Sequence, residues 1–422
     1  MMQKTSSAVR DEVPCPFCGL ACDDLRIDVR RLDVLANGCE LSRASFALFN
    51  TPKTAAPRIA GKTATLAETA AEAARLLRPS RQPLFGGLGT DVAGMRALLQ
   101  LADRCGAVVD HMDSAFLMRN VLALQDSGWL TTTLSEIKNR ADLLILAGTD
   151  VVSRFPRFFE RYVWNRDSLF EHGKREIVYL GRGLNVQAGV SPDGRKPEVI
   201  DCDVARLGEF AGALRALVAG KTLQAGKIAD VPPVELQKLA SRMQNARYGV
   251  LVWSAADFDF PHAELAVQSL CELIKDLNRA TRFSGFPLGG NEGGMTASQV
   301  CAWQSGYPAR IGFGSGHPEY DPHHFSAPRM LETGEADFLL WVSSFNSKRV
   351  PPASQAPTVV LGCNGMVFKK EPDVYIPVAT PGIDHAGHIY RTDNVVALRL
   401  RKLRQSALSS VAEVVTAIEK AV

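Results

Sequence analysis

Short apolar runs of strand length recur along the chain and alternate with segments of helical periodicity. The strand-like runs are QPLFGGLG, AVVD, ADLLILAG, EIVYLG, YGVLVW, DFLLWV and TVVLG. The helix-like segments between them include DVAGMRALLQLADRCG, VARLGEFAGALRALVAG and HAELAVQSLCELIKDLNRA. Strands that are apolar on both faces and separated by helices are typical of parallel sheets. The pattern therefore predicts an α/β protein built from doubly wound lobes.

Two further helices are predicted by their own signals. Thr65 and Glu68 have the spacing of a capping box before LAETAAEAARLL, and Pro79 ends that segment. The C-terminal run SALSSVAEVVTAIEKAV has the pattern of a closing amphipathic helix. The stretches between EIVYLG and YGVLVW and over residues 281–335 are too long for simple loops, and their Gly, Pro and aromatic content is typical of loops that build sites.

Charge and composition exclude some partners. The 48 basic and 45 acidic residues give a net charge of +3, which favours neither nucleic acid nor a membrane surface. The N-terminal residues lack the apolar core of a secretory signal, and no run reaches the roughly 18 apolar residues of a spanning helix. We therefore expect a cytoplasmic protein.

Four of the nine cysteines lie close together near the N-terminus, with the spacing C-x2-C-x3-C-x16-C. They are Cys15, Cys18, Cys22 and Cys39, and in a reducing compartment such a group indicates metal ligation before disulfides. Three thiolates in one turn and a fourth at a distance can hold a [4Fe-4S] cubane. Structural zinc is the first alternative, although zinc usually takes two paired C-x2-C knuckles. Small buried core residues are the second alternative.

Other candidate groups are weaker. Gly86, Gly87 and Gly89 follow a strand and could cradle a phosphate, or could simply form a tight turn that packs a helix on its strand. The pairs His323-His324 and His385-x-x-His388 could bind zinc, but they bring no further ligands at a convincing spacing, so we expect surface or subunit contacts.

Several motifs resemble one enzyme family over nearly the whole chain. The N-terminal cysteine spacing resembles that of molybdopterin and tungstopterin oxidoreductases. Residues 282–322, which contain PLGG, AWQSGYP and GHPEYDP, are similar to a loop segment in the B subunit of formylmethanofuran dehydrogenase, as are KDLNRATRF and GHIYRTDNVVALRLRK. The resemblance implies a fold that encloses a bis-pterin tungsten or molybdenum centre beside a [4Fe-4S] cluster. It also implies interconversion of carbon dioxide and formate at that metal.

At the positions that carry this chemistry, the chain departs from the family pattern. The family's metal-binding Cys-His pair matches a place within Asp113–Met118, where this chain has Phe116 and Leu117. A phenyl ring has no lone pair for a metal, and leucine cannot transfer a proton. The family's arginine in PMRG corresponds to Gly289, and Asp150 lies where the pterin diphosphate would be repelled.

The resemblance and the departures together lead to three hypotheses. We expect a component like the B subunit of a formylmethanofuran dehydrogenase or formyltransferase/hydrolase complex in one-carbon metabolism, of the aerobic methylotroph type. In this hypothesis the chain has lost its own redox site, lacks a pterin and holds the hydrolase and transferase subunits together. An active tungsten- or molybdenum-pterin dehydrogenase subunit is the alternative, and an electron-transfer protein that kept only its cluster is the third. The predicted division is 1–55 for the iron–sulfur domain, 56–345 for interleaved lobes around a vestigial pterin cleft, and 346–422 for a C-terminal α/β segment with the closing helix.

Overall fold

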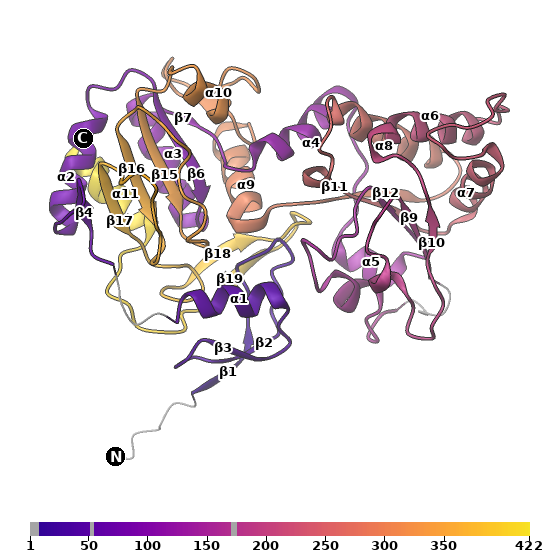
Figure 1. Ribbon diagram of the computed structural model, residues 1–422, viewed down its shortest axis with the longest axis horizontal. Coiled ribbons are helices and arrows are strands. Elements are labelled where there is room, and N and C mark those ends of the chain that lie inside the picture. The colour runs from indigo at the N-terminus through magenta and orange to yellow at the C-terminus, as the bar shows by residue number, and fades with distance from the viewer. Residues whose placement is uncertain (1–7, 51–54, 170–174) are drawn as a thin grey trace. The chain divides into compact units, whose positions relative to one another are not determined.

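The chain divides into two compact units, one of which is a continuous insertion in the other. The computed structural model describes residues 8–50, 55–169 and 175–422. Unit 1 consists of Met1–Ser114 and Gly290–Val422, and unit 2 of Ala115–Gly289. The first and last parts of the chain, indigo and yellow in Figure 1, therefore belong to the same unit. The predicted boundaries at residues 55 and 345 stay predictions.

Unit 2 is built on a five-stranded sheet that is parallel throughout, in the order β10-β9-β8-β11-β12. Its strands are β8 (Leu143–Ala147), β9 (Glu176–Leu180), β10 (Glu198–Ile200), β11 (Gly249–Ser254) and β12 (Phe283–Leu288). Because Ser254 pairs with Leu288 in register, the chain leaves β11 and β12 at the same edge of the sheet.

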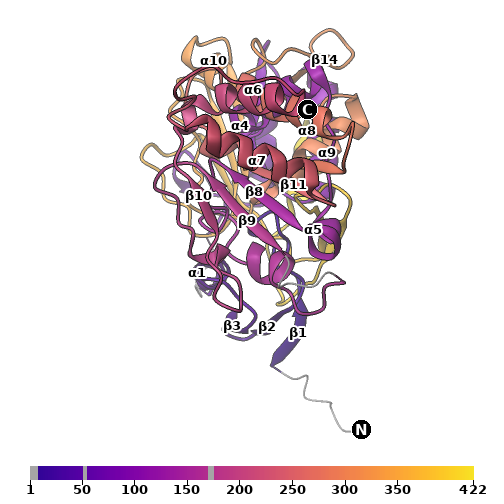
Figure 2. The ribbon, with the colours of Figure 1, turned by 90° about the vertical axis from the view of Figure 1, so that its right-hand side faces the viewer.

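Helices cover this sheet and bury a large apolar core. The helices of unit 2 are α4 (Ser114–Ser127, which begins at the last residue of unit 1), α5 (Leu134–Arg140), α6 (Leu207–Val218), α7 (Pro233–Asn245) and α8 (Ala263–Leu277). The helices α6, α7 and α8 pack together over one face of the strands, as Figure 2 shows. A π-helical turn at Phe159–Val163 packs aromatic rings against Tyr179 of β9.

Unit 1 contains a nine-stranded sheet in the order β14-β13-β7-β6-β15-β16-β17-β4-β5. The central strands β7, β6, β15, β16 and β17 are parallel, whereas the outer pairings are antiparallel. The strands are β4 (Arg58–Ile59), β5 (Lys62–Thr63), β6 (Pro83–Gly89), β7 (Val108–Val109), β13 (Ile311–Gly312), β14 (Glu319–Tyr320), β15 (Phe338–Ser343), β16 (Thr358–Gly362) and β17 (Val374–Pro377).

Several helices accompany this sheet in unit 1. They are α2 (Leu66–Leu77), α3 (Val92–Cys105), α9 (Gly294–Ser305), α10 (Ala327–Glu332) and α11 (Val411–Ala421). The C-terminal helix α11 packs against α2 and α3. The hairpin β18 (Gly387–Tyr390) and β19 (Ala397–Leu400) contacts α3 and α9.

The cysteine-bearing segment forms its own small antiparallel sheet within unit 1. Strands β1 (Val9–Val13), β2 (Leu25–Asp28) and β3 (Asp33–Ala36) pair in that order, and helix α1 (Glu40–Leu48) follows.

The α/β prediction is confirmed, since each strand and helix predicted from the apolar runs is present. Thr65 and Glu68 form the capping box of α2. Residues 281–335 hold more regular structure than site-building loops alone, because they include β12, α9 and α10. None of the helices within the described ranges is long and apolar enough to span a bilayer.

Candidate functional site

Three of the four clustered cysteines lie in the loop between β1 and β2. Cys15, Cys18 and Cys22 are each less than 10% exposed. The Cys15 N–H donates to the Cys22 carbonyl at 2.7 Å, and the Ala21 N–H donates to the Cys18 carbonyl at 3.1 Å. Ala21 has a left-handed φ of 46°. These contacts fold the loop back on itself and hold the three thiols within one turn.

Cys39 approaches from the start of α1. It is the N-cap residue of that helix, and its Sγ accepts the Ser42 N–H at 3.4 Å. The Ser42 hydroxyl donates in turn to the Cys39 carbonyl at 2.8 Å. Cys39 is therefore fixed at the first turn of α1.

The four thiols lie close enough together for the others to raise the pKa of Cys15, and for Cys22 and Cys39 to raise the pKa of Cys18. Burial raises the pKa of Cys18 to about 12, and the nearby Cys22 and Cys39 add to that rise. Burial also raises the pKa of Cys15, and the other three cysteines raise it further. Such thiols ionise when a cationic metal group balances the thiolate charge, so this donor set fits a metal cluster. Within the described ranges, no three Cys, His, Asp or Glu side chains are arranged to hold a single metal ion.

The cysteine loop is anchored to distant parts of unit 1. The Gly19 N–H donates to Asn291 Oδ1 at 2.8 Å, and the Gly19 carbonyl accepts the Thr392 N–H at 2.7 Å. The ring of Phe17 packs edge-on against Phe46 of α1, with ring centroids 5.0 Å apart. The loop is therefore held in place by the end of the chain as well as by its own helix.

Helix α4 carries Phe116 and Leu117, the two positions that the sequence analysis matched to the family's metal-binding pair. Phe116 and Leu117 are both half-buried. The guanidinium carbon of Arg119 lies 5.3 Å from the centroid of the Phe116 ring, and Arg119 Nη1 donates to the Ala255 carbonyl at 2.6 Å. The phenyl ring is thus held by a cation on one face, and neither Phe116 nor Leu117 offers a lone pair.

Gly289 follows β12 directly, and the space around it is open. A Cβ added there would meet no atom within 4 Å, and its φ lies outside the left-handed region. Neither crowding nor backbone conformation requires glycine at this position. A Cβ at position 289 would therefore extend into open space.

The edge of unit 2 that follows β8 and β11 contains two carboxylates. Asp150 accepts the Ser153 N–H at 3.0 Å and the Ser153 hydroxyl at 2.8 Å. Asp257 accepts the Thr149 hydroxyl at 2.7 Å and Arg154 Nε at 2.5 Å. Carboxylates that are already bonded to the surrounding side chains leave little attraction here for a diphosphate.

At the corresponding edge of unit 1, an arginine bridges two carboxylates. Arg349 Nε donates to Glu292 at 2.5 Å, and its Nη2 donates to Asp113. Glu292 has a left-handed φ of 52° and also accepts from the Asn346 amide. The loops after β7 and β15 and before α9 are therefore linked by one ionic group.

A second buried group lies at the end of β7. Asp110 is fully buried and accepts the Ala327 N–H at 2.8 Å, with Arg310 Nε 3.7 Å away. Burial raises the pKa of Asp110 to about 6, against the opposing effect of Arg310. Burial lowers the pKa of the adjacent His111 to about 4. His111 Nδ1 accepts the Asp113 N–H at 3.0 Å, so the neutral ring carries its proton on Nε2.

The glycine-rich strand β6 serves packing. Gly86, Gly87 and Gly89 lie within β6, and a Cβ on Gly87 would come within 2.5 Å of the Val342 carbonyl oxygen of β15. Asp91 caps the following helix α3 by accepting a first-turn N–H at 3.0 Å. A carboxylate at that helix end opposes a phosphate, so the tight packing turn is the interpretation that the geometry supports.

The histidine pairs do not assemble ligand sets in the described ranges. His324 Nδ1 lies 2.8 Å from Asp321, beside His323, on an exposed turn. His385 Nδ1 lies 2.7 Å from the carbonyl of the following residue, and His388 is exposed.

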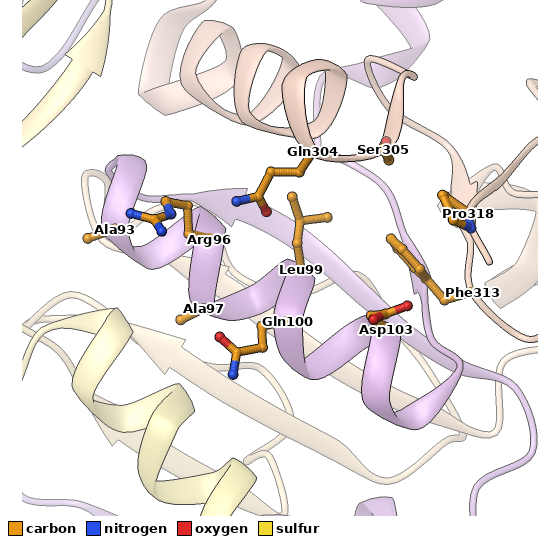
Figure 3. Close-up of a pocket in the computed structure, with 10 residues that line it drawn as sticks. All are labelled: Ala93, Arg96, Ala97, Leu99, Gln100, Asp103, Gln304, Ser305, Phe313 and Pro318. Atoms are coloured by element: carbon orange, nitrogen blue, oxygen red, sulfur yellow. The ribbon is translucent and has the colours of Figure 1, made fainter. Parts of the chain in front are cut away.

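A groove of about 630 Å³ opens on unit 1 between α3, the end of α9 and the loop that follows β13 (Figure 3). In Figure 3, the Gln304 side chain extends from α9 toward α3. The groove is lined by both polar and apolar residues: Ala93, Arg96, Ala97, Leu99, Gln100, Asp103, Gln304, Ser305, Phe313 and Pro318. None of the clustered cysteines and none of the positions 116, 117 and 289 lines this groove.

Comparison with solved structures identifies the class of fold. The chain resembles acetylene hydratase from Pelobacter acetylenicus with a TM-score of 0.66 over 98% of this chain and 70% of that one, at 8% identity. At that identity the likeness shows the fold alone, a mixed α/β fold with parallel sheets. The formyltransferase/hydrolase complex FhcABCD from Methylorubrum extorquens, solved with methylofuran, matches with a TM-score of 0.71 and 27% identity, over 86% of this chain and 98% of the matched one.

Comparison with curated sequences identifies the family. The chain is 30% identical over 414 residues to the B subunit of the tungsten-containing formylmethanofuran dehydrogenase 2 of Methanocaldococcus jannaschii, covering 93% of each. It is 28% identical over 325 residues to the B subunit of the formyltransferase/hydrolase complex Fhc of Methylorubrum extorquens, covering 75% of this chain and 83% of that protein. The chain belongs to the family of formylmethanofuran dehydrogenase B subunits, which confirms the predicted resemblance. No protein-family model matches the sequence.

The sequence indicated the four clustered cysteines and positions 116, 117 and 289 as candidate site positions, and their roles stay predictions. The sequence did not indicate Arg119 or the bridging Arg349. A lone arginine in a helix and another in a Pro- and Ser-rich loop carry no motif, and only the fold brings them to these edges.

Proposed function

We propose that this chain is the B subunit of a cytoplasmic formyltransferase/hydrolase complex of one-carbon metabolism. In that complex it would hold the transferase and hydrolase subunits together and carry out no redox chemistry at a site of its own. The family membership supports the subunit assignment, and the matching FhcABCD structure is itself a multisubunit complex.

The environment of Phe116 is the observation that supports the proposed loss of the redox site. Its ring is packed under the Arg119 guanidinium on α4, at the position where the family has its metal ligand. An aromatic ring offers no lone pair, and a fixed cation beside it disfavours a second cation. Gly289 and Leu117 leave two further roles of the family site unfilled.

The residues present do not fit a bis-pterin tungsten or molybdenum centre. Besides Phe116, the edges of both parallel sheets present carboxylates, namely Asp150 and Asp257 in unit 2 and Glu292 in unit 1. Arginines or hydroxyl groups of the protein already neutralise or bond them. We therefore assign no step to such a centre.

The cysteine set does fit a [4Fe-4S] cluster. Cys15, Cys18 and Cys22 would hold it from one loop and Cys39 from the start of α1. When bound, such a cluster supplies one-electron transfer. The protein's own contribution is burial: the loop and α1 exclude water from three of the four sulfurs. In an assembly subunit the cluster would tie these two segments together.

An active formylmethanofuran dehydrogenase subunit is the second candidate. One observation favours it: the relatives named as tungsten-containing dehydrogenases match 93% of this chain, a larger share than the Fhc relative does. It would require a metal that binds without a protein thiolate beside Phe116.

Metal analysis of the anaerobically purified complex, with electron paramagnetic resonance of its reduced form, separates the two candidates. We expect about four irons per copy of this chain, with neither tungsten nor molybdenum. Tungsten or molybdenum at one per chain would overturn the proposed loss of the redox site. If the complex contains no iron and about one zinc per chain, the cysteines bind structural zinc in place of the cluster.

A further inference from the structure

The Arg119 side chain is fixed in place while most of its hydrogen-bond donors stay available. A guanidinium has five N–H groups. Among the contacts of the described residues, Arg119 makes one hydrogen bond, from Nη1 to the Ala255 carbonyl, and covers the Phe116 ring. No carboxylate within those ranges forms an ion pair with it. A half-buried, preorganised arginine without an acidic partner is an available site for an anion.

Strand register places this guanidinium close to the open space at Gly289. Ser254 of β11 and Leu288 of β12 are paired neighbours, and each strand ends there: Ala255, which begins a 3-10 turn, and Gly289 follow them directly in the chain. Adjacent strands lie roughly 5 Å apart, and Arg119 is bonded to the first of these two residues. The volume that a side chain at position 289 would fill is therefore next to the cation.

Helix α4 packs on one identifiable face of the sheet. A Cβ on Gly285 of β12 would come within 2.8 Å of the Trp253 indole, and that indole donates to Asn120 of α4. Helix α4, which carries Arg119, therefore lies beside the C-terminal half of β12, the strand that Gly289 follows.

The carboxylate closest in sequence to Ala255 already has a cationic partner. Asp257, two residues beyond Ala255, is paired with Arg154 Nε at 2.5 Å and bonded by the Thr149 hydroxyl. Phe116 supplies a flat apolar wall. The combination is a cation with free planar donors, an apolar wall and an opening in which an added Cβ meets nothing within 4 Å.

We propose that Arg119 and the opening at Gly289 bind a small carboxylate, with formate as the ligand. The carboxylate would take two parallel N–H donors of the guanidinium, which is the geometry that arginine offers to carboxylates. Hydrolysis of a formyl group releases formate, so the choice of formate rests on the proposed function. The carboxylate chemistry rests on Arg119 and Gly289. The site binds the ligand and performs no chemistry on it.

Titration of the intact complex with ¹³C-formate, followed by NMR line broadening, tests this site. Because a ligand of three heavy atoms gains little binding energy, we expect a dissociation constant on the order of 1 mM. Arg119→Gln should raise the dissociation constant for formate at this site at least about tenfold. Gly289→Leu should abolish this binding by filling the opening, while far-UV circular dichroism stays unchanged. The matched control is Arg96→Gln, which removes another arginine without a described acidic partner, in the groove of unit 1, and should leave binding unchanged.

Several outcomes overturn the proposal. The first is that Arg119→Gln does not reduce the binding of formate to the complex. The second is that Arg96→Gln reduces formate binding as much as Arg119→Gln does. The third is that chloride displaces formate at equal ionic strength. These outcomes are distinct from failure of the proposed function, because tungsten or molybdenum in the complex would refute the latter and leave the Arg119-dependent binding to be measured as before.

Discussion

Asp110 and His111 are consecutive residues at the end of β7, and burial shifts their pKa values in opposite directions. The pKa of Asp110 rises to about 6, and the pKa of His111 falls to about 4. Each shift favours the neutral form, because a buried charge is costly. Between about pH 4 and 6 both side chains are therefore uncharged in the folded protein.

The two shifts predict opposing effects of pH on stability. Unfolded Asp110 loses its proton near pH 4, whereas the folded form keeps it up to about pH 6, so its contribution to stability falls as the pH rises through that window. Unfolded His111 binds a proton below about pH 6.5, whereas folded His111 binds one only below about pH 4. The contribution of His111 to stability therefore rises with pH in this window. The two contributions largely cancel in the wild type.

Single substitutions should reveal the effect of each residue on the pH dependence of stability. Relative to the wild-type complex, we expect Asp110→Asn to gain stability with rising pH between about pH 4.5 and 6, and His111→Asn to lose it, each by roughly 1 kcal/mol per pH unit. Urea unfolding midpoints across this range measure both effects. Parallel pH profiles for the three proteins would contradict the assignment.

Removal of a cluster cysteine should release iron from the complex. Cys22→Ser replaces a buried thiol in the loop after β1, and we expect iron to fall from about four per chain to well below one, with loss of the resonance signal of the reduced form. The control is Cys363→Ser, at a buried cysteine outside the group, which should keep its iron. Unchanged iron in Cys22→Ser would rule out the four-cysteine site.

Two adjacent glycines should differ in their tolerance of a side chain. At Gly289 an added Cβ meets nothing and φ is unrestricted by handedness, so Gly289→Leu should change the free energy of unfolding by less than about 0.5 kcal/mol. At Gly290, φ is +78° and a Cβ would lie 2.5 Å from the Cβ of Met295, so Gly290→Leu should cost about 2–4 kcal/mol. Thermal unfolding of the two variants compares them directly. Equal destabilisation would show that position 289 is packed.

Substitution of Phe116 distinguishes an assembly subunit from an enzyme. If no metal is bound beside this ring, Phe116→Leu should leave formate production by the complex within about twofold of wild type, because a half-buried aromatic-to-aliphatic change mainly alters local packing. Formate release from a formylated carrier is the measurement. A loss of more than about tenfold with the subunits still assembled would mean that α4 takes part in the chemistry.

The sequence predicts most of the regular structure because apolar runs and capping residues act locally. The Thr65–Glu68 capping box and the buried strands β8 and β11 are examples, since each is specified by neighbouring residues. The short outer strand β13 was not predicted, because it pairs with β7, which lies far earlier in the chain. The hairpins β13–β14 and β18–β19 were not predicted either, although their strands are neighbours in the sequence.

The candidate site could be proposed from the sequence only where residue type and spacing indicate chemistry. The cysteine spacing and the assignments of Phe116 and Gly289 are such cases, and they stay predictions. The Arg349 bridge to Asp113 and Glu292 joins three segments separated by long stretches of chain, and the contact of Arg119 with Ala255 depends on how α4 packs on unit 2. Such contacts leave no local pattern.

The insertion of unit 2 within unit 1 determines when the larger sheet can form during synthesis. Strand β6 pairs on one side with β15, which leaves the ribosome about 250 residues later. At ordinary translation rates that delay is roughly 10–50 seconds. Unit 2 is continuous and can complete its own sheet in that interval. The edge of β6 that pairs with β15 stays unpaired until β15 is synthesised. Nascent chains that end before β15 should therefore depend on chaperones, whereas chains that extend past it should not.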